Sequence, residues 1–221
     1  MTNELFSSPV TMLGASVLIT LVPILFLLIS PFLKLSIVFG VLRTGFGTQG
    51  IPGTAALSAL SLILSINVLS PVIMETAQII EELSRAKVAK SKTSSLEKFA
   101  EIISVDGLKI FQPIEKFLQG HIGKKEEAFF SSTNFTSIKQ TPKILVLIPA
   151  FVLSELKTAF EMSLTLFLPF FVIDIVVTSL LTAMGMMMIN PVNLTFPIKL
   201  LLFINCDGWL ELTKSLILSY K

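Results

Sequence analysis

Charged residues divide the chain into two apolar parts and a polar part between them. A first uncharged run covers Leu5–Leu33, and a second, Thr44–Pro71, continues without charge up to Glu75. Each run exceeds the roughly 20 residues that an α-helix needs to cross a bilayer. The pattern predicts long apolar helices, the first with a kink or early end at Pro23 and Pro31, because proline removes a backbone hydrogen bond and clashes with the preceding turn.

The same pattern divides the chain into three segments. Residues 1–74 are expected to form an N-terminal hydrophobic helical hairpin, with a glycine-rich connection that contains Gly40, Gly45, Gly47, Gly50 and Gly53. Residues 75–143 hold more than half of the charged residues and must be solvated. Residues 144–221 are expected to form a C-terminal hydrophobic hairpin that carries a methionine-rich loop. The short connection carries Lys and Arg and is placed on the cytoplasmic side, and the long charged segment outside.

Two amphipathic helices are predicted inside the charged segment. Ser94 to Glu97 fits a capping box ahead of apolar residues at helical spacing. A second helix would place Ile114, Phe117 and Leu118 on one face. We interpret this segment as a small helical hairpin that covers the membrane part.

The C-terminal apolar part contains charges that a lipid-facing helix would avoid. Each would cost about 2.5–3.5 kcal/mol at the centre of a membrane helix, so we expect pairing between helices or subunits. Lys157 and Glu161 are four positions apart and can face each other. Asp174 has no opposite charge within four positions, so its partner should come from another helix or subunit, and a proton-relay role is the alternative. The candidates for pairing are Glu155, Lys157, Asp174, Lys199 and Asp207.

Composition places the chain in the membrane class, with 52% hydrophobic residues, 14% charged residues and a mean hydropathy of +0.82. The net charge of +2 provides no basic stripe for nucleic acid. With one cysteine and one histidine, neither an intrachain disulfide nor a zinc cluster is expected. No nucleophile with a base and no phosphate-binding glycine loop stands out, so the sequence predicts neither an enzyme nor a cofactor.

Residues 182–191, TAMGMMMINP, contain four of the eight methionines: Met184, Met186, Met187 and Met188. Methionines at the end of an apolar run most often fill gaps in a core. Because soft thioethers select copper(I), a copper(I) or small-ion membrane permease is an alternative. Against it, there is no second methionine motif along a span to make a relay.

Three consecutive blocks resemble the SctR/FliP family, the export-gate proteins of bacterial type III secretion systems. They are LIPAFVLSELKTAF (147–160), FLPFFVIDIVVTSLLTAMGMMM (167–188) and FPIKLLLFINCDGW (196–209). VLRTGFGTQG (41–50) resembles the family's first conserved loop, which more often reads LRNALGTQQ. Thr44, Gly45, Phe46 and Gly50 depart from that pattern.

The resemblance implies an all-α, multi-span subunit with broken helices, and a function as a passage for unfolded polypeptides across the bacterial inner membrane. Five copies would assemble with two smaller membrane subunits into a conical complex that extends toward the periplasmic side, where residues 75–143 would lie. Larger export-gate and switch proteins of the system would be further partners. The short chain favours the injectisome branch over the flagellar one, and energy for transport would come from elsewhere.

Within that family, the methionines are interpreted as a gate. Consecutive helical residues are about 100° apart, so Met186, Met187 and Met188 cannot all face one axis unless the helix breaks. Gly185 before them and Asn190-Pro191 after them permit a loop, with Gly185 and Pro191 as hinges. A ring of adaptable thioethers, with Met184 beside it, would seal a pore and still reshape around a passing polypeptide.

Overall fold

The computed structural model describes residues 20, 23–24, 26–47, 50, 52–88, 110–132, 143–186 and 188–221. Within these residues the backbone forms helices and short connections, and no strand is present. The predicted all-α class is therefore confirmed for the described part of the chain. The conical hetero-oligomer stays a prediction.

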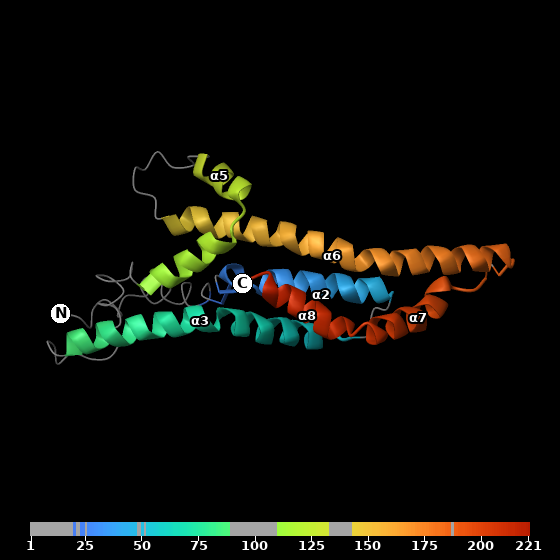
Figure 1. Ribbon diagram of the computed structural model, residues 1–221, viewed down its shortest axis with the longest axis horizontal. Coiled ribbons are helices and arrows are strands. Elements are labelled where there is room, and N and C mark those ends of the chain that lie inside the picture. The colour runs from blue at the N-terminus through green and yellow to red at the C-terminus, as the bar shows by residue number, and fades with distance from the viewer. Residues whose placement is uncertain are drawn as a thin grey trace, which may run out of the picture.

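Figure 1 shows an elongated molecule in which α6 runs along most of the length and α2 lies between α6 and α3. The contacts agree with this arrangement, because α2 packs against both of these helices and α7 returns along the far end of α6. The helices are α2 (Phe32–Phe46), α3 (Thr54–Val88), α5 (Lys124–Ser132), α6 (Lys143–Ala183), α7 (Pro191–Asn205), α8 (Gly208–Leu218) and a segment over 110–121.

The main core is built on one face of α2. Its fully buried apolar residues recur at helical spacing, and they meet residues of α3, α6, α7 and α8. The ring of Phe46 lies 5.1 Å from that of Phe170 and 5.4 Å from that of Phe203, measured between centroids. Because three distant segments meet at Phe46, this cluster holds α2, α6 and α7 together.

The glycine-rich connection is shorter than expected. Gly40 and Gly45 lie inside α2, and the helix ends at Gly47, whose φ of 81° is in the left-handed region. The prediction that both belong to the connection was wrong, because packing outweighs the weak helix propensity of glycine here. A Cβ on Gly45 would lie 2.7 Å from Cδ2 of Phe170, so the close approach of α6 requires a glycine.

Among the described residues, two helical stretches are long and apolar enough to cross a membrane, Thr54–Glu82 in α3 and Val146–Ala183 in α6. The second predicted apolar run therefore lies largely in α3, which continues beyond residue 74, where the sequence pattern placed a segment boundary. Most of the first predicted run lies outside the described residues. Where that run is described, the helix over 26–29 ends at Ser30, and Pro31 precedes α2, in agreement with the predicted break.

The later described part of the charged segment, residues 110–132, packs on the start of α6. Leu118 of the 110–121 helix is buried with Leu147 and Phe151, and Ile114 and Phe117 pack against the same cluster. The predicted apolar face of this helix is thus confirmed. Ser94 to Glu97, and the helix predicted after them, lie outside the described residues.

Candidate functional site

α6, which ends directly before Met184, terminates in a defined turn. The N–H of Gly185 donates to the carbonyl of Thr182 (3.0 Å), and the N–H of Met186 donates to that of Leu181 (2.9 Å). With Gly185 at a φ of 76°, this pair of bonds is a Schellman motif, in which the left-handed residue is usually glycine. The end of α6 is therefore encoded locally, by a glycine in the position that the motif requires.

The next helix begins with an equally local signal. The side chain of Asn190 accepts a hydrogen bond from the N–H of Val192 (3.0 Å), and Pro191 occupies the first position of α7. Asparagine is among the preferred N-cap residues, and proline at this position loses no helical hydrogen bond. The helix break predicted between Gly185 and Asn190 is present, and it makes α6 and α7 a hairpin with the methionines at its tip (Figure 1).

The described methionines of this loop project away from the core. The exposed fraction is 68% for Met184 and 100% for Met188, and Met186 is also exposed. Met187 lies outside the described residues. Core filling, the usual role of such a cluster, does not apply to the three described side chains within this chain.

An ion pair lies behind the loop and joins α6 to α7. Lys199 Nζ is 2.6 Å from Oδ2 of Asp174 and 2.8 Å from the carbonyl oxygen of Gly45. The lysine side chain is 1% exposed, whereas the carboxylate is 38% exposed. Asp174 therefore finds its partner on another helix of the same chain. The buried ammonium, held by two oxygens, ties α6, α7 and α2 at one point.

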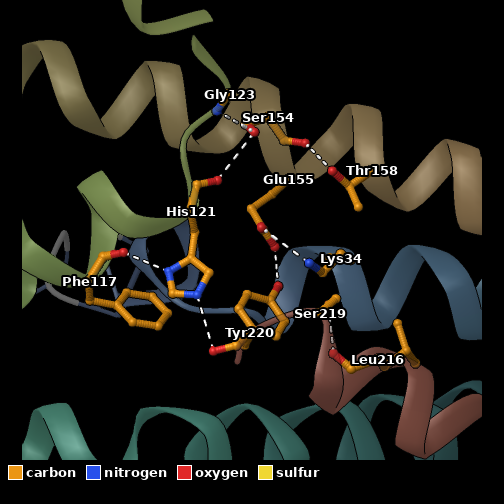
Figure 2. Close-up of polar contacts among 10 residues, drawn as sticks. All are labelled: Lys34, Phe117, His121, Gly123, Ser154, Glu155, Thr158, Leu216, Ser219 and Tyr220. Carbon is orange, nitrogen blue, oxygen red and sulfur yellow. Dashed lines mark hydrogen bonds and ion pairs between the residues drawn. The ribbon is translucent and has the colours of Figure 1, made fainter.

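A second polar cluster lies at the other end of the α2–α6 contact (Figure 2). Lys34 Nζ is 3.3 Å from Oε1 of Glu155, and both side chains are buried. The hydroxyl of Tyr220 donates to Oε2 of Glu155, and the ammonium of Lys34 lies 3.7 Å from the centroid of the tyrosine ring. Both carboxylate oxygens of Glu155 are thus bonded, as a buried charge requires. Burial, and then the adjacent carboxylate, raise the pKa of Tyr220 above its ordinary value.

His121 and Ser154 extend this cluster (Figure 2). Nδ1 of His121 is 2.7 Å from the carbonyl oxygen of Phe117, and Nε2 is 3.2 Å from that of Tyr220. Ser154 Oγ accepts from the N–H of Gly123 (3.0 Å) and donates to the carbonyl of His121 (3.3 Å). The end of the 110–121 helix is therefore fastened to α6.

The remaining two charged candidates do not join either cluster. Lys157 pairs with Glu126 of α5 at 3.3 Å and not with Glu161, because α5 folds back over α6. The backbone amide of Glu126, and then its bond with Lys157, lower the pKa of that carboxyl. Asp207 is exposed in a left-handed conformation with a φ of 49°, and no described residue forms an ion pair with it.

Sequence reasoning missed three members of these clusters. The sequence pattern assigns Lys34 to the connection, and a lysine is rarely buried unless it is paired, so its burial could be recognised only with its partner Glu155. His121 was examined for zinc or nucleophile chemistry, and Tyr220 follows the last apolar run without any motif. No three His, Cys, Asp or Glu side chains of the described residues are grouped so that they could hold a metal ion.

Comparison with known proteins connects this architecture to secretion. The FliP family profile matches residues 16–216. The chain is 37% identical over 210 residues to the Yop proteins translocation protein R of Yersinia pestis, with 92% of each chain covered. It is 36% identical over 210 residues to the surface presentation of antigens protein SpaP of Salmonella typhimurium, covering 91% of this chain and 92% of the relative.

A flagellar relative aligns over nearly the whole length as well. The flagellar biosynthetic protein FliP of Bacillus subtilis is 34% identical over 221 residues, which cover 98% of this chain and 94% of the relative. Both secretion and flagellar relatives thus align with more than nine-tenths of the chain. The chain belongs to the FliP family of type III secretion and flagellar export apparatus membrane proteins.

Proposed function

We propose that the chain is a core subunit of an export gate, which forms a passage for unfolded polypeptides across the bacterial inner membrane. The observation that carries this proposal is the position of Met184, Met186 and Met188, exposed at the tip of an apolar helical hairpin. An exposed cluster of large apolar side chains marks a contact with another molecule. In a ring of copies, Met186, Met187 and Met188 would meet around one opening, with Met184 beside them and Gly185 and Pro191 as hinges.

The length of α6 supports an assembly that extends beyond the bilayer. The apolar stretch Val146–Ala183 has 38 residues, which at 1.5 Å per residue is about 57 Å, whereas the hydrocarbon core is about 30 Å thick. Most residues of this stretch are not buried within the chain. Because water cannot cover the excess apolar surface without cost, other subunits should cover it. This favours a complex with other subunits, for which the family resemblance implies five copies and smaller membrane subunits, rising toward the periplasmic side.

The ion pair between Asp174 and Lys199 also supports the proposal, because it fixes the base of the α6–α7 hairpin. Asp174 and Lys199 join α6 to α7, and the same lysine reaches Gly45 on α2. A loop on such a support can change shape at its tip while its base stays fixed. The names of the relatives, which refer to the translocation of Yop proteins and to flagellar biosynthesis, fit this transport function. They give no support to a copper(I) permease.

The test replaces Met186, Met187 and Met188 together by alanine in cells with the complete secretion system. We expect normal assembly and increased leakage of small ions across the membrane, because alanine is too short to close the ring. Replacement by three leucines should restore the seal but slow secretion, since leucine adapts less readily than methionine. Met74→Ala removes an exposed methionine (67%) from α3, outside the loop, and serves as the control. Unchanged leakage in the assembled triple-alanine complex would refute the seal.

A further inference from the structure

A pocket between α2 and α3 has no part in the proposed seal. It has a volume of about 470 Å³ and lies where α2 ends and α3 begins. Its polar lining combines one guanidinium with four hydroxyl groups, from Arg43, Ser36, Thr44, Thr54 and Ser58. The lining contains no carboxylate, and the first turn of α3 has no acidic residue. Such a lining favours a ligand that carries negative charge and accepts hydrogen bonds.

The pocket offers hydrogen-bond donors from both helices. Arg43 of α2 is half-buried, and a guanidinium has five N–H groups in a fork that matches the oxygens of a phosphate, so it can bind one and keep another contact. Thr54 and Ser58 lie one turn apart on α3, and their hydroxyls form no hydrogen bond with another described residue. The hydroxyls of Ser36 and Thr44 already donate to carbonyls of α2, at 3.0 Å each. The donors for a ligand are therefore the guanidinium and the two hydroxyls of α3.

The pocket lies at the start of an apolar helix. Thr54 is the first residue of α3 and of the stretch Thr54–Glu82, which is long and apolar enough to cross a membrane. Leu62 and Ile66 follow Ser58 at intervals of four residues, so they lie on the same side of α3, and both side chains are exposed. A phosphate in the pocket would therefore lie at the level where a span meets the polar surface of the bilayer, with apolar side chains directly beside it along the helix.

We propose that this pocket binds the phosphate group of an anionic phospholipid. The guanidinium and the two hydroxyls of α3 hold the phosphate, and an acyl chain lies against Leu62 and Ile66. A zwitterionic lipid adds a cation, for which the lining has no carboxylate. A free phosphate ion would use the pocket alone and leave the apolar side chains without a role. Because the short connection that carries Lys and Arg is predicted on the cytoplasmic side, the lipid belongs to the cytoplasmic leaflet.

Native mass spectrometry of the full chain tests the site. The chain is released from nanodiscs that contain equal amounts of dioleoyl phosphatidylglycerol and dioleoyl phosphatidylcholine, which have the same acyl chains and differ in net charge. We expect the retained lipid to be enriched in phosphatidylglycerol by about tenfold, as expected for a charge-assisted hydrogen bond. Equal retention of the two lipids by the native chain would overturn the proposal, and this measurement requires no variant.

Variants separate a built site from general attraction to a basic surface. Arg43→Gln should remove the enrichment, and Arg43→Lys should retain part of it, because an ammonium attracts phosphate without the fork geometry. Gly40→Leu keeps the charge and fills the pocket, which Gly40 also lines. A Cβ at this glycine meets no atom within 4 Å, so the variant leaves the packing of α2 intact, and it should also lose the enrichment. Enrichment that survives in Gly40→Leu would contradict the pocket.

Arg85→Gln is the matched control for the charge. It removes an exposed arginine near the other end of α3 and should leave the enrichment unchanged. A loss equal to that of Arg43→Gln would show that net charge alone selects the lipid, and would overturn the site.

Two further results would assign the pocket to another ligand. Excess inorganic phosphate should not displace phosphatidylglycerol, because it lacks acyl chains, and displacement would indicate a site for free anions. Equal retention of both lipids, together with weaker assembly of Arg43→Gln with the other subunits, would indicate an acidic side chain of a partner protein. Either result would overturn the lipid site. Because none of these readouts measures ion leakage or secretion, failure of the pore seal and failure of the lipid site are distinguishable.

Discussion

Gly45 shows how a single missing methyl group positions a helix. Phe170 occupies the space that a Cβ would need, and the carbonyl of the same glycine binds the buried ammonium of Lys199. A glycine in a helix costs about 0.5–1 kcal/mol relative to alanine. This cost is offset by core packing, because α6 can approach α2 closely. The ring centroids of Phe170 and Phe46 lie 5.1 Å apart.

We expect Gly45→Ala to destabilise the chain by about 1–3 kcal/mol, because Phe170 must leave its place in the core. Gly40→Ala is the matched control on the same helix, where an added Cβ meets no atom within 4 Å. This control should be neutral or stabilise by up to about 1 kcal/mol. Thermal unfolding followed by fluorescence of Trp209, the single tryptophan, measures both changes. Equal effects of the two substitutions would contradict the assigned contact.

Tyr220 offers a titration that reports one residue, because the chain has one tyrosine. Its pKa is raised above the ordinary value of 10.0, first by burial and then by Glu155. The ultraviolet signal of phenolate should therefore be absent near pH 10 in the folded chain and appear there after denaturation. Since the unfolded chain ionises first, the stabilisation from Tyr220 is complete below pH 10 and declines at higher pH. A phenolate signal near pH 10 in the folded chain would show that Tyr220 is not buried as described.

The α6–α7 hairpin is an element in which local signals and one distant contact cooperate. The glycine of the Schellman motif, the Asn190 cap and Pro191 define where the helices end, and these are readable from neighbouring residues. The angle at which α7 returns depends on Asp174 and Lys199, which are far apart in the sequence. Breaking this pair should therefore affect the hairpin without altering its turn.

Asp174→Leu should destabilise the chain by about 1–3 kcal/mol, because Lys199 stays buried with the carbonyl of Gly45 as its remaining described acceptor. The effect is limited because the lost carboxylate is 38% exposed. The yield of assembled complex should fall with it. Replacing Asp174 and Lys199 together by leucine should recover part of the stability, since no unpaired charge remains. Normal assembly of Asp174→Leu with an altered response to the proton gradient would indicate a relay instead of a structural pair.

At the scale of the whole molecule, the exposed apolar surface is the dominant feature. α6 and α7 expose large residues along most of their lengths, among them Phe160, Leu164, Leu168, Leu201 and Ile204. Lipid can cover only the part of α6 that fits the bilayer. The rest of this surface requires protein neighbours, which agrees with membership of an export apparatus family.

Native mass spectrometry of the chain, co-expressed with the neighbouring export-apparatus subunits, measures the assembly directly. We expect a complex with five copies of this chain together with two kinds of smaller membrane subunit. Expression of the chain alone provides the comparison, and it should give lower yields because the apolar faces stay uncovered. A stable monomer in both preparations would contradict the proposed gate.

The sequence by itself determined the features that depend on composition and near neighbours. It was sufficient for the membrane class, the all-α fold of the described residues, the apolar face of the 110–121 helix and the break after Met184. It also carried the blocks by which the family was recognised. These features follow from hydrophobic content, helical periodicity and the conformational limits of glycine and proline, all of which act over a few residues.

Only the tertiary structure decided which charged groups meet. Lys34 and Glu155 are separated by 121 positions, and His121 and Tyr220 by 99, so no local pattern could pair them. The sequence placed Gly45 in a connection, whereas the close packing of Phe170 puts it inside α2. The spacing allowed Lys157 to face Glu161, and because α5 folds over α6 the lysine pairs with Glu126. The partner of a buried charge depends on which groups the tertiary structure brings near it, and therefore on the folding of the whole chain.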